Sequence, residues 1–320
     1  MHYLITGCAG FIGYHLCKKI LEKNKIAKIY GVDNINDYYD INIKLERLKD
    51  LRKYKNFEFK KIDIKNYEKI NSYLKSKKIV YLVNLAAQAG VRHSIDNPHD
   101  YIDSNIVGFI NILEGCRKQN IENFIFASSS SVYGNNREAP FSVTDRVDNP
   151  ISLYAATKKS NELIAYTYSH LYKIPTIGLR FFTVYGPWGR PDMAYYKFSE
   201  KIISNNSISL YNNGKMKRDF TYIDDIIDGI MLCLNKKYEF EIFNLGNGNT
   251  EELLDMVNIL ENYLNKKAIT HFKDMQPGDV KMTSADINKT SKMIGYSPRT
   301  NLDEGLMKFV DWYTNYINKG

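Results

Sequence analysis

Residues 7–13 read Gly7-Cys8-Ala9-Gly10-Phe11-Ile12-Gly13, and this stretch decides the fold. It follows an apolar run at 2–6 that predicts a strand, and it opens a segment with helical spacing at 10–22. Such a loop needs glycine for a tight turn, for close approach of a pyrophosphate, and for packing of helix against strand. The free N–H groups at the start of the helix then favour phosphate. We therefore expect Gly7, Gly10, Phe11, Ile12 and Gly13 to hold a dinucleotide.

Strands and helices alternate outward from this loop. The predicted strands lie at 29–32, 57–62, 80–85, 124–128, 176–181 and 240–245, and the predicted helices at 66–75, 98–119, 154–171 and 302–318. Buried-type strands separated by helices are typical of an α/β protein with a doubly wound parallel sheet of the Rossmann type. The second half is less regular, which indicates a smaller mixed C-terminal domain.

An acidic residue, Asp33, ends the second predicted strand. A carboxylate there accepts hydrogen bonds from an adenosine ribose and repels a 2′-phosphate, which favours NAD over NADP. The alternative is a capping aspartate before a turn. Ligands also bind at the carboxyl ends of other strands in such sheets. The further cofactor positions that this rule predicts are Asn34, Asp63, Ile64, Leu85, Ala86 and Ala87.

Composition narrows the class of protein. The 320 residues are 44% hydrophobic and 25% charged, which suits one large domain or two intimate ones. No apolar run reaches the roughly 18 residues of a membrane span, and the first residues read as strand and turn rather than as a signal peptide. The four cysteines match no metal or redox spacing, so we expect buried thiols, no metal site and a cytoplasmic location. The net charge of +8 comes from scattered lysines, so neither a nucleic acid nor a membrane is an expected partner.

Tyr154-Ala-Ala-Thr-Lys158 carries the chemistry. Residues four apart lie on the same face of a helix, so Lys158 would lie near Tyr154. A nearby cation lowers the pKa of a tyrosine. Lys158, or a bound nicotinamidium ring, would therefore make Tyr154 a usable base. Ser129 ends the fifth predicted strand, where its hydroxyl would bridge a substrate oxygen and Tyr154. A Tyr-x-x-x-Lys pair alone is usually surface, but here it follows a cofactor loop and a strand-end serine.

With these motifs, the chain resembles the extended short-chain dehydrogenase/reductases that act on nucleotide sugars, over essentially its whole length. The resemblance implies that Tyr154 is the acid/base, that Lys158 holds the nicotinamide ribose and tunes Tyr154, and that Ser129 orients the sugar hydroxyl. Asn105 resembles the helix asparagine that supports this family's active site, and by that resemblance we expect it among the cofactor-binding residues; a buried structural asparagine is the alternative. The resemblance also implies a homodimer through the helices at 98–119 and 154–171.

The reaction is indicated by a departure from related enzymes. Dehydratases of this family carry Asp-Glu, and decarboxylases carry Glu, where this chain has Ser130-Ser131. Neutral hydroxyls do not supply the acid and base that elimination needs, but they can bind a carboxylate. The stretches 87–92, 180–193 and 217–225 closely resemble UDP-glucuronate 4-epimerases. We therefore expect C4 epimerisation of UDP-glucuronate to UDP-galacturonate through a 4-keto intermediate.

The substrate contacts follow from this resemblance. Ser130, Ser131 and Thr183 are the expected ligands of the C5 carboxylate. Arg190 and Arg218 are the diphosphate candidates, because a guanidinium fork gives two aligned charge-assisted bonds. Asp279 resembles the family's uridine-ribose acid, and Arg92 reaches the substrate at a group that we leave open. Surface arginines and a turn aspartate are the structural alternatives.

Several alternatives stay open. One is 4-epimerisation of another UDP-sugar, such as UDP-galactose or an N-acetylhexosamine uronate. A UDP-glucuronate decarboxylase and a catalytically silent NAD-binding scaffold follow. We expect residues 1–180 to form the NAD-binding domain, with about 219–248 returning to it, and 181–320 to form the UDP-sugar-binding domain.

Overall fold

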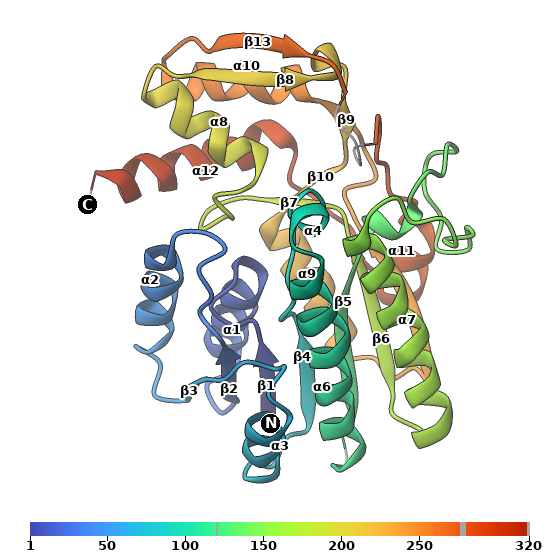
Figure 1. Ribbon diagram of the computed structural model, residues 1–320. Helices are drawn as coiled ribbons and strands as arrows, with labels where there is room; N and C mark the ends of the chain where they lie inside the picture. The colour runs from blue at the N-terminus through green and yellow to red at the C-terminus, as the bar shows by residue number, and fades with distance from the viewer. Residues whose placement is uncertain (120, 276–279, 319–320) are drawn as a thin grey trace.

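A seven-stranded parallel sheet forms the centre of the computed structural model, which describes residues 1–119, 121–275 and 280–318 (Figure 1). The strand order is β11-β6-β5-β4-β1-β2-β3. The strands are β1 (His2–Thr6), β2 (Lys28–Asp33), β3 (Phe57–Lys61), β4 (Tyr81–Asn84), β5 (Asn123–Ser129), β6 (Thr176–Phe181) and β11 (Phe240–Leu245). Every strand pair in this sheet is parallel, so the predicted doubly wound sheet is confirmed.

Helices cover both faces of the sheet (Figure 1). One face carries α1 (Phe11–Lys23), α2 (Ile41–Leu51) and α9 (Ile223–Leu234), and the other carries α3 (Tyr67–Lys75), α6 (Gly108–Arg117) and α7 (Leu153–Tyr172). Each layer has its own apolar core, because strands buried on both faces must pack against helices on each side. The segment 240–245 returns to the sheet as its edge strand, next to β6, as the sequence predicts.

The predicted helix at 98–119 is divided into three parts. A short α5 (Pro98–Tyr101) leads into a π-helical segment, η1 (Ile102–Val107), before α6 begins. The wider turn of η1 carries Asn105 toward α7, where Asn161 donates to its carbonyl at 2.6 Å. A single regular helix was therefore the wrong prediction here. One-turn π segments occur often at functional sites in proteins.

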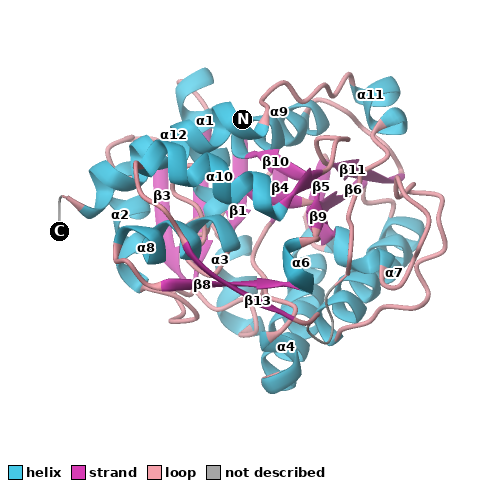
Figure 2. Ribbon diagram, turned by 90° about the horizontal axis from the view of Figure 1, so that it is seen from above, coloured by secondary structure: helices cyan, strands magenta, loops and turns pink. Residues whose placement is uncertain are grey.

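A smaller lobe lies across the carboxyl ends of the strands (Figures 1 and 2). Its helices are α8 (Ala194–Ile203), α10 (Leu253–Leu264) and α12 (Leu302–Ile317), whereas α11 (Asn288–Ile294) packs against β11 at the edge of the central sheet. Its strands form three pairs: β7 (Thr183–Tyr185) with β10 (Phe220–Tyr222), β9 (Lys217–Arg218) with β12 (Glu251–Glu252), and β8 (Ser207–Tyr211) with β13 (Ile269–Lys273). The lobe begins directly after β6, so its first residues lie at the edge where the sheet presents its ligand-binding loops.

The strand order places a switch point between β1 and β4. From β1 the chain builds β2 and β3 on one side and then crosses to β4 on the other. The loops after β1 and β4 therefore diverge and leave a crevice, which is where ligands bind in open α/β sheets.

Candidate active site

A cavity of about 570 Å³ lies at this crevice, between the sheet and the smaller lobe. That volume is in the usual range of a small-molecule site, roughly 300–1,000 Å³. The cavity brings together the predicted cofactor and catalytic residues, with one exception, and the predicted substrate residues that lie within the described chain. These residues are Gly7, Gly10, Phe11, Ile12, Gly13, Asp33, Asn34, Asp63, Ile64, Leu85, Ala86, Ala87, Arg92, Ser129, Ser130, Ser131, Tyr154, Lys158, Thr183, Arg190 and Arg218.

The glycine loop forms a close-fitting cradle at one end of the cavity. Gly7 has a left-handed backbone with φ of +70°, which glycine adopts without strain. A Cβ on Gly13 would lie 2.1 Å from the Gly7 carbonyl oxygen, so a side chain there would push α1 away from the loop. The start of α1 thus stays close enough to offer its N–H groups to a phosphate.

Asp33 lies beside this cradle, and its carboxylate organises the backbone around it. The Ala9 N–H donates to one Asp33 oxygen at 3.1 Å, and the Ile35 N–H donates to the other at 2.8 Å. Burial raises the pKa of Asp33, and these backbone donors oppose that effect. Asn34 and Asp63 lie together across the loop, with the Asn34 amide donating to Asp63 at 3.2 Å.

Asn105 is the exception, because its side chain does not line the cavity. Its amide oxygen accepts from the Gln88 N–H at 2.8 Å, and its amide nitrogen donates to the Gln88 carbonyl at 3.0 Å and to Thr157 at 3.1 Å. We therefore correct the expectation that Asn105 contacts the cofactor. It ties the loop after β4 to α7, the helix that carries Tyr154 and Lys158.

The catalytic side chains converge from β5 and α7. Ser152 begins α7 by accepting from the Ala155 N–H at 3.1 Å, which places Tyr154 and Lys158 one turn apart at the start of the helix. The Lys158 ammonium donates to the Ala127 carbonyl at 2.8 Å and lies 6.0 Å from the centre of the Tyr154 ring. The Ser129 hydroxyl donates to Ser131 at 3.1 Å and lies near enough to Tyr154 to lower the pKa of the tyrosine.

Burial governs the protonation of this pair. It raises the pKa of Tyr154, although the bond from Ser129 and the charge of Arg190 both lower it. Burial also lowers the pKa of Lys158 to about 8. The Lys158 ammonium is directed at the Ala127 carbonyl, and the pKa of Tyr154 stays raised by burial. Of the two expected sources of positive charge, the nicotinamidium ring would add to the effect of Ser129 and Arg190 on Tyr154.

A buried ion pair supports the end of β5 from behind. Arg180 donates to the two oxygens of Glu162 at 2.8 and 2.9 Å, and the Ser128 hydroxyl donates to Glu162 at 2.6 Å. All four serines at 128–131 line the cavity, but the hydroxyl of Ser128 is committed to Glu162, whereas the hydroxyls of Ser129 and Ser131 contact each other at 3.1 Å.

The arginines line different parts of the cavity. Arg190 donates through Nε to Asp192 at 3.0 Å and through Nη2 to the other oxygen of the same carboxylate, so most of its fork is occupied. The Arg218 Nη1 group donates to the Lys217 carbonyl at 2.9 Å. The Arg92 guanidinium lies 5.1 Å from the centre of the Tyr211 ring, which belongs to the smaller lobe. Asp279 lies outside the described residues.

Asp192, Tyr38 and Lys44 are among the cavity residues that the sequence reasoning missed. Asp192 pairs with Arg190, and Tyr38 donates to the same carboxylate at 3.1 Å. Lys44 lines the cavity beside Asp33, and burial lowers its pKa. A signal for Lys44 existed, because the inward stripe of α2 carries Lys44 and Arg47 among its apolar residues. Cations at such positions on an amphipathic helix are unusual and point to a partner inside the protein.

The fold and this site define an extended short-chain dehydrogenase/reductase. The family model described as GDP-mannose 4,6 dehydratase matches residues 4–309, and the chain belongs to that family.

Individual relatives within the family narrow the comparison to enzymes that act on UDP-sugars. Protein CapI of Staphylococcus aureus is 50% identical, with 100% of both chains covered. UDP-glucuronate 4-epimerase 4 of Arabidopsis thaliana is 44% identical, over 98% of this chain and 76% of that protein. The UDP-glucuronic acid 4-epimerase of Bacillus cereus, solved in complex with UDP-glucuronic acid and NAD, superposes with a TM-score of 0.93 at 35% identity, covering 99% and 100% of the two chains.

Proposed function

We propose that this chain is an NAD-dependent epimerase that converts UDP-glucuronate to UDP-galacturonate at C4 through a 4-keto intermediate. The observation that carries the proposal is a single cavity that holds Ser129, Tyr154 and Lys158 beside hydroxyls, not carboxylates, at Ser130 and Ser131. Elimination or decarboxylation aided by an acidic side chain finds no such group at these two positions. Relatives named UDP-glucuronate 4-epimerase match nearly the whole chain.

The residues present fit NAD as the cofactor. The cradle at Gly7 and Gly13 leaves no room for a side chain and suits a pyrophosphate. Asp33 has both oxygens at the cavity end of β2, each with one backbone donor and remaining acceptor capacity for ribose hydroxyls. NAD bound there would accept a hydride from C4 of the sugar and return it to the opposite face of the same carbon.

The chain's own residues move the proton. Tyr154 removes it from the C4 hydroxyl, Ser129 orients that hydroxyl, and the same tyrosine returns the proton after the sugar has turned about its diphosphate linkage. Burial raises the pKa of Tyr154, and the positive charge of an oxidised nicotinamide ring beside it would lower that pKa and favour the base. Lys158 would hold the nicotinamide ribose from its position at the Ala127 carbonyl.

The 4-keto intermediate must also keep its carboxylate. A 4-keto uronic acid is a β-keto acid, and it loses CO2 when the carboxylate is aligned with the carbonyl π system. Ser130, Ser131 and Thr183 line the cavity, and we propose that they hold the carboxylate out of that alignment. A Ser131→Ala, Thr183→Val double variant should lose at least about 10-fold in kcat/KM on UDP-glucuronate, since two hydrogen bonds to a charged group are removed. Wild-type kcat/KM in that variant would contradict the assignment.

The remaining substrate contacts are also proposals. Arg218 lies at the rim and keeps the role of diphosphate ligand. Arg190 takes part less directly, since its fork is paired with Asp192 and its charge acts on Tyr154. Asp279 stays the proposed ligand of the uridine ribose, and Arg92 stays an undefined substrate contact.

The test is to incubate purified protein with UDP-glucuronate, without added NAD, and to follow the sugar by NMR. Formation of UDP-galacturonate supports the reaction, the substrate and a retained cofactor together. No reaction even with added NAD would overturn the substrate, and neutral or N-acetylated UDP-sugars would then be assayed. Formation of a UDP-pentose and CO2 would overturn the argument from Ser130 and Ser131.

The domain boundaries, the location in the cell and the oligomeric state are also proposals. We propose that residues 1–180, with 219–248, form the NAD-binding domain and that the rest of 181–320 binds the UDP-sugar. A cytoplasmic location is supported by the four cysteines, which are all free and buried. We propose a homodimer through η1, α6 and α7, as argued below. No helix among the described residues is long and apolar enough to cross a membrane, and those residues contain no cluster of His, Cys, Asp or Glu that could hold a metal ion.

A further inference from the structure

Arg47 is a buried cation whose acceptors are all uncharged. Its side chain is 0% exposed, on the inward face of α2. The guanidinium donates to three backbone carbonyls and to the Tyr39 hydroxyl, and no described carboxylate is paired with it. Burying a charge without a counterion is costly, so a residue of this kind needs a reason beyond packing.

The carbonyls that Arg47 binds come from two distant segments. Nη1 donates to the Ala9 carbonyl in the glycine loop at 2.9 Å. Nη2 donates to the carbonyls of Trp188 and Gly189, at 2.5 and 3.1 Å. The first segment cradles the proposed dinucleotide, and the second leads directly into Arg190 and Asp192 in the cavity. One planar group therefore joins the cofactor loop to the loop of the smaller lobe.

The second segment depends on its neighbours for its shape. Trp188 has a φ of +58°, a left-handed conformation that costs energy for a bulky residue. The His15 ring is hydrogen-bonded to the Pro187 carbonyl at 2.9 Å, and the Trp188 ring packs 5.2 Å from that of Trp312. Burial lowers the pKa of His15 to about 3, so this bond comes from a neutral imidazole. These contacts support the loop in its left-handed conformation at Trp188.

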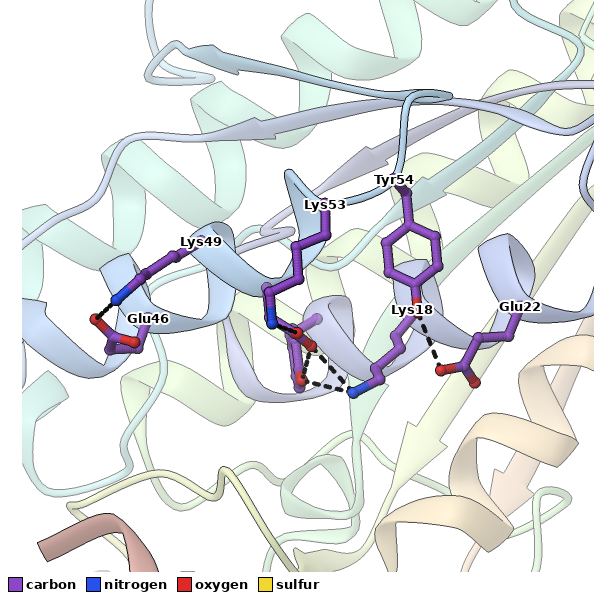
Figure 3. Close-up of polar contacts among 8 residues, drawn as sticks. Lys18, Glu22, Glu46, Lys49, Lys53 and Tyr54 are labelled. Atoms are coloured by element: carbon purple, nitrogen blue, oxygen red, sulfur yellow. Dashed lines mark hydrogen bonds and ion pairs between the residues drawn. The ribbon is translucent and has the colours of Figure 1, made fainter. Parts of the chain in front are cut away.

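The helix that carries Arg47 is fastened to the cofactor-binding side. Asp50 accepts from Tyr14 at 2.7 Å and from both Lys18 and Lys53 at 3.0 Å. Figure 3 shows this polar face of α1 and α2, with Tyr54 also reaching Glu22. Arg47 thus projects from a support that is anchored to α1, the helix that begins at the glycine loop.

We propose that Arg47 is a positioning residue that couples dinucleotide binding to UDP-sugar binding. Phosphate at the glycine loop fixes the Ala9 carbonyl, and the guanidinium carries that constraint to the Trp188 and Gly189 carbonyls. Arg190 and Asp192 are then held in the arrangement that meets the sugar nucleotide. The inference rests on the proposed function, because it takes the second ligand to be a UDP-sugar. Coupling of this kind is reciprocal and is typically about 5–150-fold in affinity.

The test measures the affinity of UDP, by calorimetry, for protein loaded with NAD and for the same protein depleted of NAD. Wild-type protein should bind UDP about 10-fold more tightly when NAD is bound. Arg47→Met should reduce this ratio to below about 2-fold, and Arg47→Lys should give an intermediate ratio, because one ammonium cannot span both segments. Arg52→Met is the matched control, since Arg52 directly follows the last residue of α2 and its guanidinium lies 5.4 Å from the centre of the Phe59 ring.

Each outcome decides the matter. A merely structural Arg47 would lower the melting temperature but leave the coupling ratio unchanged, and that result would overturn the inference. So would wild-type protein that binds UDP equally with and without NAD. Wild-type protein that binds no UDP at all would overturn the proposed function, and this inference with it. If Arg47→Met does not fold, the ratio for Arg47→Lys decides: a wild-type ratio overturns the inference, and a reduced ratio supports it.

Discussion

At the scale of single residues, burial acts on the two main catalytic side chains in the same sense. It raises the pKa of Tyr154 and lowers that of Lys158 to about 8, so both are driven toward their neutral forms. With a pKa of about 8, Lys158 stays mainly charged at pH 7, whereas Tyr154 would need a further positive charge, such as that of an oxidised nicotinamide ring, to become a base. Electrostatic tuning of this kind is common where side chains must exchange protons near neutral pH.

Replacing Tyr154 by phenylalanine isolates the proton transfer. Tyr154→Phe should lower kcat by about 10³-fold, within the range expected for loss of a general acid/base. The Kd for UDP should change by no more than about 2-fold, because the hydroxyl faces the sugar and not the nucleotide. NMR assays of turnover and calorimetry with UDP measure the two quantities. A kcat within 10-fold of wild type would show that another group serves as the base.

The buried ammonium of Lys158 should lower the free energy of unfolding of the protein. Its pKa of about 8 lies below the ordinary value of 10.5, so the unfolded chain binds more protons between pH 8 and 10.5. Stability from this group therefore rises with pH across that window, and the full cost of the buried ammonium is present below pH 8. Lys158→Met should raise the free energy of unfolding of NAD-depleted protein at pH 7 by about 2 kcal/mol, after allowing for the lost bond to Ala127.

The measurement is urea unfolding of both proteins at pH 7, 8, 9 and 10. The advantage of Lys158→Met should be largest at pH 7 and should shrink steadily toward pH 10, where the wild-type amine is neutral in the folded state. An advantage that is independent of pH would mean that packing, and not the buried charge, explains the difference.

At the scale of elements, the buried strands were the most predictable part of the chain. The predicted runs at 2–6, 176–181 and 240–245 coincide with β1, β6 and β11, because parallel strands buried on both faces are continuous apolar runs. The glycine loop was equally predictable, because its left-handed backbone at Gly7 and its close packing at Gly13 require glycine. The π-helical turn at η1 was not predictable, because the same apolar spacing suits a regular helix and the distinction depends on contacts with α7.

The residues that support the site from outside the cavity could not be predicted either, because their partners are distant in the sequence. Arg47 and Trp188 lie 141 residues apart in the chain, and Ser128 and Glu162 lie 34 apart. No local pattern specifies such pairs, because tertiary packing alone brings them together. Asn105 shows the converse case, since its motif was recognised but its contacts are with Gln88 and Thr157.

The start of α1 offers a test at this scale. Gly13→Ala would place a Cβ 2.1 Å from the Gly7 carbonyl oxygen, so the helix must move away from the cradle. The NAD content of the purified protein should fall at least about 10-fold, because helix N–H groups and loop no longer converge on a phosphate. Gly295→Ala is the control: its φ of +77° makes the change straining, but a Cβ there meets no atom within 4 Å. It should lower stability by about 1 kcal/mol and leave the NAD content unchanged.

At the scale of the whole molecule, one helix joins the cavity to the surface. The first turn of α7 carries Tyr154 and Lys158 into the cavity, while later turns expose Leu163 and Tyr166, which are 58% and 55% accessible. The neighbouring η1 exposes Ile102 and Val107, and η1 contacts α7 directly. Figure 1 shows α6 and α7 beside each other on one face of the sheet. Large apolar side chains gathered on adjacent helices are typical of a protein interface.

A second copy of the chain is the partner that this face would meet, and the dimer gives the final prediction. In a two-fold dimer each residue of the patch appears twice, so one charged substitution buries two unpaired charges. Leu163→Arg should therefore convert a particle of about twice 37.1 kDa into a monomer at micromolar concentration, as measured by light scattering after gel filtration. Ile26→Arg, at a position that is 85% exposed and remote from α7, should leave the mass unchanged. Because α7 also positions Tyr154, the monomeric variant should have a lower melting temperature and a reduced kcat. A monomeric wild-type protein at that concentration would instead show that α7 holds the catalytic pair without a partner.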